Sequence, residues 1–352
     1  MKKTFSVILL LSLLTRGFSQ WELSLTCNTG ESISGISAPS NNIIWVITQN
    51  FFIYRTFSGG SNWKRIKCNG LEDNISLSHF YVLNGSTAFI SVSKNTGVGP
   101  GLIYKTSDSG RSWQLVFTHK GTCTIKLGMF NEHKGLMACS FDSFDGSVKS
   151  GQALYRTTDG GDTWIRDSAD PAKNFIMNLE IKGKQAAITD YKNFYWSGDR
   201  GNSFPVSNKL HDPSSPKYNL QFEDSNYAIL NASNLVDILV KRPGTGGWID
   251  IKVPPGIDDG FITGIVLDGN ECWMTEAFDT NKLYYSTDSA KTFTFTIPII
   301  NSSFQFLTKA RKGRTLIGGT PSFMSGKIYI NKRAPALSEY PVAYYNKVHL
   351  EQ

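Results

Sequence analysis

One turn motif recurs along this chain, and its spacing constrains the fold more than any other feature. The clearest copy, residues 154–164, reads Leu-Tyr-Arg-Thr-Thr-Asp-Gly-Gly-Asp-Thr-Trp. Residues 103–113 keep the same tyrosine, hydroxyl, carboxylate, glycine and tryptophan in the same order. Weaker copies occupy residues 53–63, 194–204 and 283–293, so the motif returns at intervals of about forty to fifty residues or a multiple of them. Recurrence at this period indicates an array of like supersecondary units.

A second pattern precedes the motif in each unit: an apolar strand, a short polar turn and another apolar strand. It occurs seven times, with turns at residues 39–42, 83–86, 132–135, 181–184, 223–226, 267–270 and 309–313. Pairs such as Asn84-Gly85 and Asp268-Gly269 supply the positive φ of a tight hairpin. A third strand then leads into the motif and a fourth follows it. Four antiparallel strands repeated seven times predict an all-β fold, a seven-bladed β-propeller.

The two ends of the repeat array predict how the ring closes. Residues 21–25 look like the fourth strand of a blade without its partners, and the seventh unit supplies three strands, through Ile330. We therefore expect the N-terminal strand to complete the last blade and cover its exposed edge. The predicted organisation is a signal peptide at 1–19, the propeller at 20–335 and a C-terminal tail at 336–352.

The first nineteen residues have the features of an export signal. Lys2 and Lys3 precede an apolar run at 5–14, and Gly17 and Ser19 are small residues before the expected cleavage point. The run is too short for a membrane span of about 20 residues, so we expect a secreted or periplasmic protein without stable membrane insertion. Removing Lys2, Lys3 and Arg16 lowers the formal net charge from +7 to +4. A charge this small gives little reason to propose nucleic-acid binding.

The cysteines suggest neither a metal site nor a complete disulfide framework. The five cysteines are an odd number, so at least one is a free thiol, and no two have metal-ligand spacing. Cys139 and Cys272 lie in apolar strand-like runs and are expected to be buried thiols. Cys27 and Cys68 each follow a tryptophan by five or six residues, which leaves a disulfide between adjacent units open. No metal and no cofactor is expected.

The motif Ser/Thr-x-Asp-x-Gly-x-Ser/Thr-Trp resembles the Asp box, or bacterial neuraminidase repeat. The resemblance implies a propeller of the kind found in sialidases, xyloglucan-type glycosidases, sortilin-type receptors and photosystem assembly factors. A carboxylate in such a turn can accept backbone N–H groups while the aromatic ring packs between blades. We therefore interpret the motif residues as structural rather than catalytic or calcium-binding: Asp108, Gly110, Trp113, Asp159, Gly161, Trp164, Asp199 and Asp288.

The enzyme hypothesis needs residues that the sequence does not readily supply. A sialidase of this kind would carry an Arg-Ile-Pro motif in its first unit and three arginines for the substrate carboxylate. The first unit instead reads Ile-Ser-Ala-Pro at 36–39. Arg55, Arg156 and Arg242 occupy equivalent positions in their units, which predicts a scaffold role. Glycosidase chemistry in general needs two carboxylates about 5–10 Å apart.

Candidate ligand-binding residues lie in loops between second and third strands, the usual ligand face of a propeller: Asp142, Phe144, Asp145, Asp190, Glu276 and Asp279. The blade-three loop mixes aromatic rings with carboxylates, which suits a carbohydrate or a peptide; a solvated insertion is the alternative. We expect a monomeric, non-catalytic binding or scaffold propeller whose partner is a glycan or a protein. The alternative is a sialidase-like exo-glycosidase.

Overall fold

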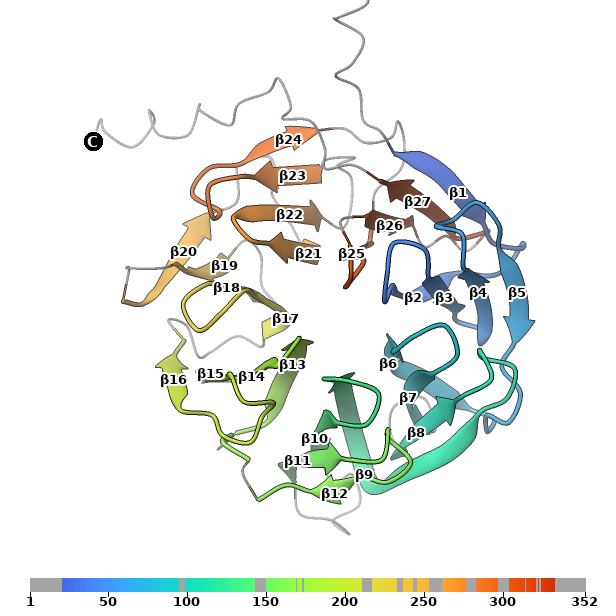
Figure 1. Ribbon diagram of the computed structural model, residues 1–352, viewed down its shortest axis with the longest axis horizontal. Coiled ribbons are helices and arrows are strands. Elements are labelled where there is room, and N and C mark those ends of the chain that lie inside the picture. The colour runs from blue at the N-terminus through green and yellow to red at the C-terminus, as the bar shows by residue number, and fades with distance from the viewer. Residues whose placement is uncertain are drawn as a thin grey trace, which may run out of the picture.

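The protein is a ring of β-sheets around a central axis (Figure 1). The computed structural model describes residues 21–94, 99–142, 150–168, 170–172, 174–210, 217–232, 237–242, 246–252, 262–276, 283–296, 304–313, 315–320, 322 and 324–332. Within these ranges the regular secondary structure is β-strand throughout, from β1 to β27. The strands form seven blades, which confirms the predicted all-β, seven-bladed propeller.

Blades one to four follow the predicted units in chain order. Blade one contains β2 (Ile33–Ser37), β3 (Ile44–Thr48), β4 (Phe52–Thr56) and β5 (Lys64–Lys67). Blade two contains β6 (Ile75–Val82), β7 (Ala88–Lys94), β8 (Pro100–Thr106) and the first half of β9 (Gln114–Met129). Blade three contains the second half of β9, β10 (Gly135–Asp142), β11 (Gly151–Thr157) and β12 (Ile165–Arg166). Blade four contains β13 (Ile176–Lys182), β14 (Gln185–Asp190), β15 (Asn193–Ser197) and β16 (Val206–Lys209).

Blades five to seven complete the ring. Blade five contains β17 (Lys217–Phe222), β18 (Ala228–Ala232), β19 (Asp237–Lys241) and β20 (Trp248–Lys252). Blade six contains β21 (Ile262–Asp268), β22 (Glu271–Glu276), β23 (Leu283–Ser286) and β24 (Thr294–Thr296). Blade seven contains β25 (Phe306–Lys309), β26 (Leu316–Thr320), β27 (Lys327–Asn331) and β1 (Glu22–Thr26). In every blade the first strand lies nearest the axis, as Figure 1 shows.

The N-terminal strand closes the last blade, as the sequence predicts. β1 pairs antiparallel with β27, with Glu22 opposite Ile330. The same strand also reaches blade one: Ser24 Oγ donates to the Gly60 carbonyl at 2.8 Å and accepts from Trp63 Nε1 at 3.0 Å. β1 therefore joins the first and last blades as well as completing the seventh, and it covers the edge that β27 would otherwise expose.

Blades two and three share one long strand, which the repeat pattern did not predict. β9 is 16 residues long. It pairs with β8 up to Thr122 and with β10 from Thr122 onward, so the two blades form a single seven-stranded sheet. The continuous strand replaces the connection that elsewhere separates two blades.

The apolar core lies between neighbouring blades. All five residues of β3 are buried because both faces of the blade are covered. Trp45 and Ile53 of blade one pack in one cluster with Val82 and Ile90 of blade two. Each interface between blades thus removes apolar side chains from water, which stabilises the ring by about 25 cal/mol per Å² buried.

Four of the cysteines are buried: Cys27, Cys68, Cys139 and Cys272. Cys27 and Cys68 lie in two different apolar clusters, so the disulfide left open by the sequence is not formed. Burial raises the pKa of both thiols to about 12, which keeps them protonated and unreactive. The side chain of Cys123 lies outside the described residues.

Candidate functional site

The repeated aspartate turns are held together by their own carboxylates. Asp159 Oδ1 accepts the backbone N–H groups of Asp162 and Thr163 at 3.1 and 3.0 Å, and Thr163 Oγ1 donates to Oδ2 at 2.5 Å. The same bonding recurs at three further turns, at Asp108, Asp199 and Asp288. The hydrogen bonds from Thr163 hold the pKa of Asp159 well below its usual value. These carboxylates are occupied within their turns.

Glycine in these turns permits close contact between blades. Gly161 has a φ of 86°, and a Cβ there would lie 2.5 Å from the ring of Phe89 on blade two. The turn of blade three therefore packs directly on the second strand of blade two. Only a residue without a side chain fits both the left-handed backbone and this contact.

Three of the four aspartate turns are joined to the preceding blade by an arginine. Arg156 donates to the carbonyls of Arg200 and Gly201 at 3.1 and 2.7 Å. Arg242 donates to the carbonyls of the equivalent turn in blade six at 2.8 and 2.5 Å, and Arg55 reaches the turn of blade two in the same way. The predicted scaffold role of these arginines is confirmed.

Of the residues predicted to bind a ligand, Asp190 is the one whose side chain the structure describes. Asp190 is fully buried. Its carboxylate accepts the N–H groups of Lys192 and Asn193, both at 2.7 Å, and the Tyr195 hydroxyl at 3.0 Å. This carboxylate is therefore used within blade four. The side chains of the others lie outside the described residues: Asp142, Phe144, Asp145, Glu276 and Asp279.

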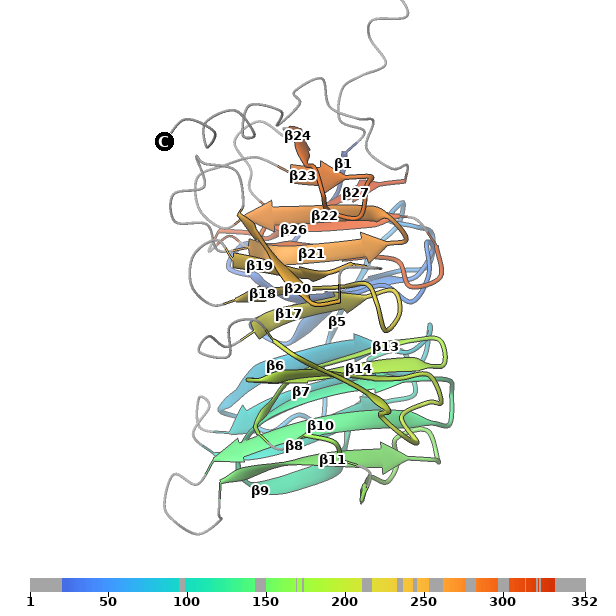
Figure 2. The same ribbon diagram turned by 90° about the vertical axis from the view of Figure 1, so that its left-hand side faces the viewer.

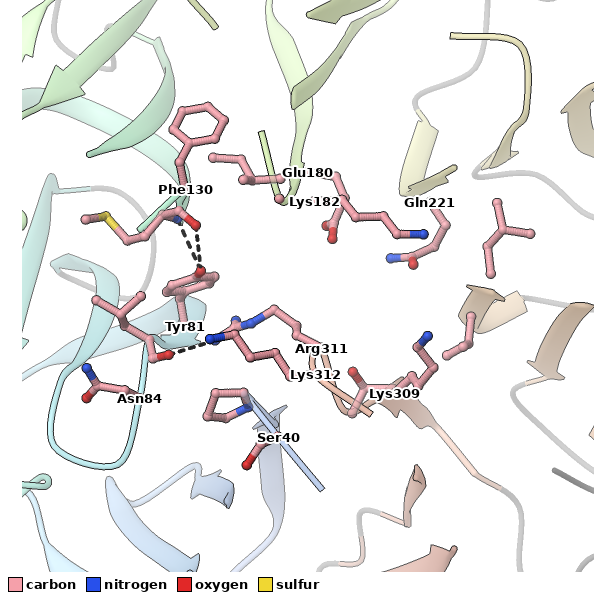
Figure 3. A pocket seen from close by; sticks show the side chains of 18 of the residues that line it. Ser40, Tyr81, Asn84, Phe130, Glu180, Lys182, Gln221, Lys309, Arg311 and Lys312 are labelled. Atoms are coloured by element: carbon pink, nitrogen blue, oxygen red, sulfur yellow. Dashed lines mark hydrogen bonds between the residues drawn. The ribbon is translucent and has the colours of Figure 1, made fainter. Parts of the chain in front are cut away.

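A cavity of about 730 Å³ opens where the central channel meets the surface (Figure 3). All seven blades line it, through the ends of their first strands and the turns that follow. These turns lie at the same end of the ring as the aspartate turns, since the Gly160 N–H donates to the His133 carbonyl at 2.8 Å and the Ser109 N–H to the Ser86 carbonyl at 2.9 Å. We call this opening the channel-mouth cavity. It lies at the opposite end of the blades from the predicted loop face.

Two ion pairs fix lysines at the rim of the channel-mouth cavity. Lys182 of blade four pairs with Glu223 of blade five. Lys309 of blade seven pairs with Asp268 of blade six at 2.7 Å. Glu223 also accepts the Gly269 N–H at 2.8 Å. These contacts run from one blade to the next, so they hold the rim charges in place before any ligand arrives.

The turn between β25 and β26 extends across the rim. Its backbone pairs with blade one: the Arg311 and Lys312 N–H groups donate to the carbonyls of Ala38 and Pro39 at 2.9 and 3.1 Å. The Arg311 side chain reaches further, past blade one to blade two, where Nη2 donates to the Val82 carbonyl. Its guanidinium lies over the Tyr81 ring at 4.3 Å.

Glu180 of β13 faces this arginine from the other side of the opening (Figure 3). Burial raises the pKa of Glu180 to about 7, against the opposing charges of Arg311, Lys126 and Lys182. No hydrogen bond or ion pair of its carboxylate occurs among the described residues. Lys126 lies beside it and donates to Asn178 Oδ1 at 2.8 Å. The cavity thus holds a half-buried carboxylate whose charge changes near neutral pH.

Sequence reasoning did not identify this cavity. Its lining residues belong to turns of ordinary hairpin composition, about forty to fifty residues apart. The one available indication was the cationic seventh turn, which contains Lys309, Arg311 and Lys312. Across the described ranges, no group of three or more His, Cys, Asp or Glu side chains could hold a metal ion. No helix there is long and apolar enough to cross a membrane.

Solved propeller structures share this fold. A structure titled "YCF48 bound to D1 peptide" is 15% identical, has a TM-score of 0.64, and is matched over 89% of this chain and 96% of the other. YCF48 from Cyanidioschyzon merolae is 14% identical and has a TM-score of 0.60; the match covers 87% of this chain and 98% of the other. The GH74 xyloglucanase from Xanthomonas campestris is 14% identical and has a TM-score of 0.64; the match covers 92% of this chain and 55% of the other. The chain matches no protein-family model and no curated protein sequence.

Proposed function

We propose that this protein is a non-catalytic binding propeller that holds a segment of a partner protein in the channel-mouth cavity. The observation that carries this proposal is the cavity itself, a 730 Å³ opening with a wall built by all seven blades. Its charged side chains are held by contacts within the ring, as in the pair of Lys309 with Asp268. A preformed site of this kind binds without first ordering its own side chains.

The chemistry of the cavity wall suits a peptide. Partly exposed apolar side chains such as Ile43, Leu83 and Ile181 line the cavity together with the Gln221 amide and the rim charges. A peptide offers both apolar side chains and a backbone that hydrogen-bonds to an amide. The shared fold with YCF48, whose structure was solved with the D1 peptide, supports a propeller that holds a peptide.

The repeated turns and the first residues extend the proposal. The bonding around Asp108 and Asp159 supports the interpretation of the turns as Asp boxes, and so a place among secreted, sialidase-like propellers.

The basic and apolar residues at 1–19 support export to the periplasm or the medium. Mass spectrometry of the protein isolated from that compartment should find an N-terminus at Gln20. An uncleaved Met1 in the exported protein would contradict this part.

Blocking the cavity tests the proposed site. The Gln221 side chain lines the opening, so Gln221→Trp should fill part of it. Gln114→Trp is the matched control, because Gln114 is exposed on the outer half of β9. Both variants are compared with wild type on arrays of random-sequence peptides and of glycans. We expect wild type and Gln114→Trp to bind the same peptides and Gln221→Trp to lose them.

Two results on these arrays count against the proposal. Peptides that bind Gln221→Trp as well as wild type would show that the cavity is not the site. Glycans bound in place of peptides would show that the ligand class is wrong. The exo-glycosidase alternative is tested with fluorogenic glycosides, sialosides included, for which we expect no hydrolysis above background.

A further inference from the structure

We propose that the channel-mouth cavity selects acidic peptide segments, seating one of their carboxylates between Arg311, Lys312 and Glu180. This inference rests on the proposed function and names the chemistry of its ligand. The three residues belong to blades seven and four and face the same opening (Figure 3).

The rim contains two cations that have no carboxylate partner among the described residues. Lys182 and Lys309 are already paired with acids on neighbouring blades. Arg311 and Lys312 have no such pair. Arg311 uses Nη2 for both of its hydrogen bonds to carbonyls, at Val82 and Leu83. Its Nε and Nη1 donors are left for a ligand, and each can donate a charge-assisted hydrogen bond to a carboxylate oxygen.

The charges that face Glu180 leave the cavity positive. They are Arg311 from the β25–β26 turn, Lys126 from β9 and Lys182 from its own strand. Glu223 neutralises Lys182. The cavity wall also includes Lys312 and a second acid, Glu132, so Arg311, Lys126 and Lys312 outnumber the carboxylates of Glu180 and Glu132. His79 on β6 adds no charge near neutral pH, because burial and the nearby Lys126 lower its pKa to about 4. Excess positive charge in an enclosed channel favours an anion.

Glu180 gives this seat a defined pH dependence. A ligand carboxylate next to Glu180 disfavours a second negative charge, so Glu180 takes up a proton from solvent when the ligand binds. Its O–H group then donates to the ligand carboxylate. Binding therefore becomes tighter as the pH falls from 8 to 6, over a range where the glutamates of a peptide stay ionised. No covalent bond forms or breaks.

The apolar part of the wall favours a peptide over a free anion. Ile43, Leu83, Phe130 and Ile181 are partly exposed and line the same opening as the charged groups. A small anion leaves these surfaces wet, whereas apolar side chains next to an acidic residue cover them. Burial of this surface adds about 25 cal/mol per Å² to the binding free energy.

Isothermal titration calorimetry with two capped hexapeptides tests the inference. One alternates leucine with glutamate, and the other alternates leucine with glutamine. We expect the glutamate peptide to bind wild type about tenfold more tightly at pH 6 and low salt. Lys312→Ala should weaken binding of the glutamate peptide several-fold. Lys64→Ala removes an exposed lysine from the outer strand of blade one and should leave this affinity unchanged. Glu180→Gln should bind with little pH dependence.

Three outcomes overturn the inference. Equal affinity for the two peptides would show that the cavity does not select carboxylates. An unchanged affinity of Lys312→Ala for the glutamate peptide would show that the carboxylate does not bind at the proposed place. Inorganic phosphate that binds more tightly than the glutamate peptide would make the ligand a free anion. If the two peptides bind wild type equally and both lose affinity in Gln221→Trp, the proposed function stands and only this inference fails.

Discussion

Arg311 of blade seven donates a hydrogen bond to the carbonyl of Val82 in blade two, although blade one lies between them. The same side chain lies over the Tyr81 ring. The ring is therefore closed twice, by β1 at its outer edge and by the β25–β26 turn at the channel mouth. The second closure also places a cation over the channel-mouth cavity.

Loss of this second closure should lower stability. Arg311→Ala removes a charged hydrogen bond and a cation–π contact, and we expect the free energy of unfolding to fall by about 1–3 kcal/mol. Lys312→Ala, which removes a neighbouring exposed cation, should leave it within about 0.5 kcal/mol of wild type. Urea unfolding followed by tryptophan fluorescence measures both. Equal stabilities of the two variants would mean that the Arg311 contacts contribute little.

The aspartate turns should contribute to stability through their ionised carboxylates. Asp159→Asn removes the acceptor of the Thr163 hydroxyl, and we expect a loss of about 1–2 kcal/mol. Asp162→Asn, three residues later, removes only an exposed ion pair with Lys105 and should cost less than about 1 kcal/mol. Thermal unfolding at pH 7 compares them. A more damaging Asp162→Asn would contradict the assigned roles.

The same turns predict the acid limit of the fold. The pKa of Asp108 is about 2 in the folded protein, because hydrogen bonds from Ser112 and others outweigh the effect of burial. The unfolded chain keeps its usual value near 3.8, so it binds a proton first as the pH falls. Stability from this group is complete above pH 4 and lost toward pH 2. Circular dichroism against pH should show this, and Asp108→Asn should lose less stability over that interval than wild type.

Glu180 predicts the opposite pH dependence. Its pKa is about 7 in the folded protein and near 4.5 in the unfolded chain, so the folded state binds the proton more tightly. Its contribution is therefore fully present below pH 4.5 and is lost as the pH rises toward 7. Glu180→Gln should be more stable than wild type by about 1 kcal/mol at pH 8, a value reduced for solvent access, and similar at pH 4. Denaturant unfolding at both pH values measures the difference. If Glu180→Gln is no more stable than wild type at pH 8, the ionised Glu180 carboxylate does not destabilise the fold.

The buried thiols should resist modification in the folded protein. Cys27 and Cys68 are 3% and 6% exposed. Treatment with iodoacetamide followed by peptide mass spectrometry should find both unmodified in the native state. Both should react after denaturation without reductant. A peptide that links Cys27 to Cys68 would contradict the free thiols described for the fold.

The strand pattern predicted the ring because blade interiors depend on local alternation and turn chemistry, which neighbouring residues encode. The closing strand at Trp21 could be predicted for the same reason, since it repeats a blade strand without partners. The cavity could not be predicted from the sequence, because the side chains that line it come from seven separate turns and meet only in the folded ring. The direction of Arg311 past blade one is set by that convergence and has no local sequence signature.

Asp190 shows a different limit of sequence reasoning. Its position after a second strand suggested the ligand face, yet its carboxylate accepts the N–H groups two and three residues later. Aspartate commonly bonds its own backbone in this way at turns. The sequence therefore held a local indication of a structural role for Asp190, beside the prediction of a ligand role.

We propose that the ligand site lies at the channel mouth. Hydrogen–deuterium exchange of the protein, with and without the leucine–glutamate hexapeptide, tests it most directly. We expect slower exchange in the turns at 81–84, 129–132, 180–183 and 309–312, and no change in the loops between second and third strands. Protection confined to those loops, with the channel-mouth turns unchanged, would contradict it.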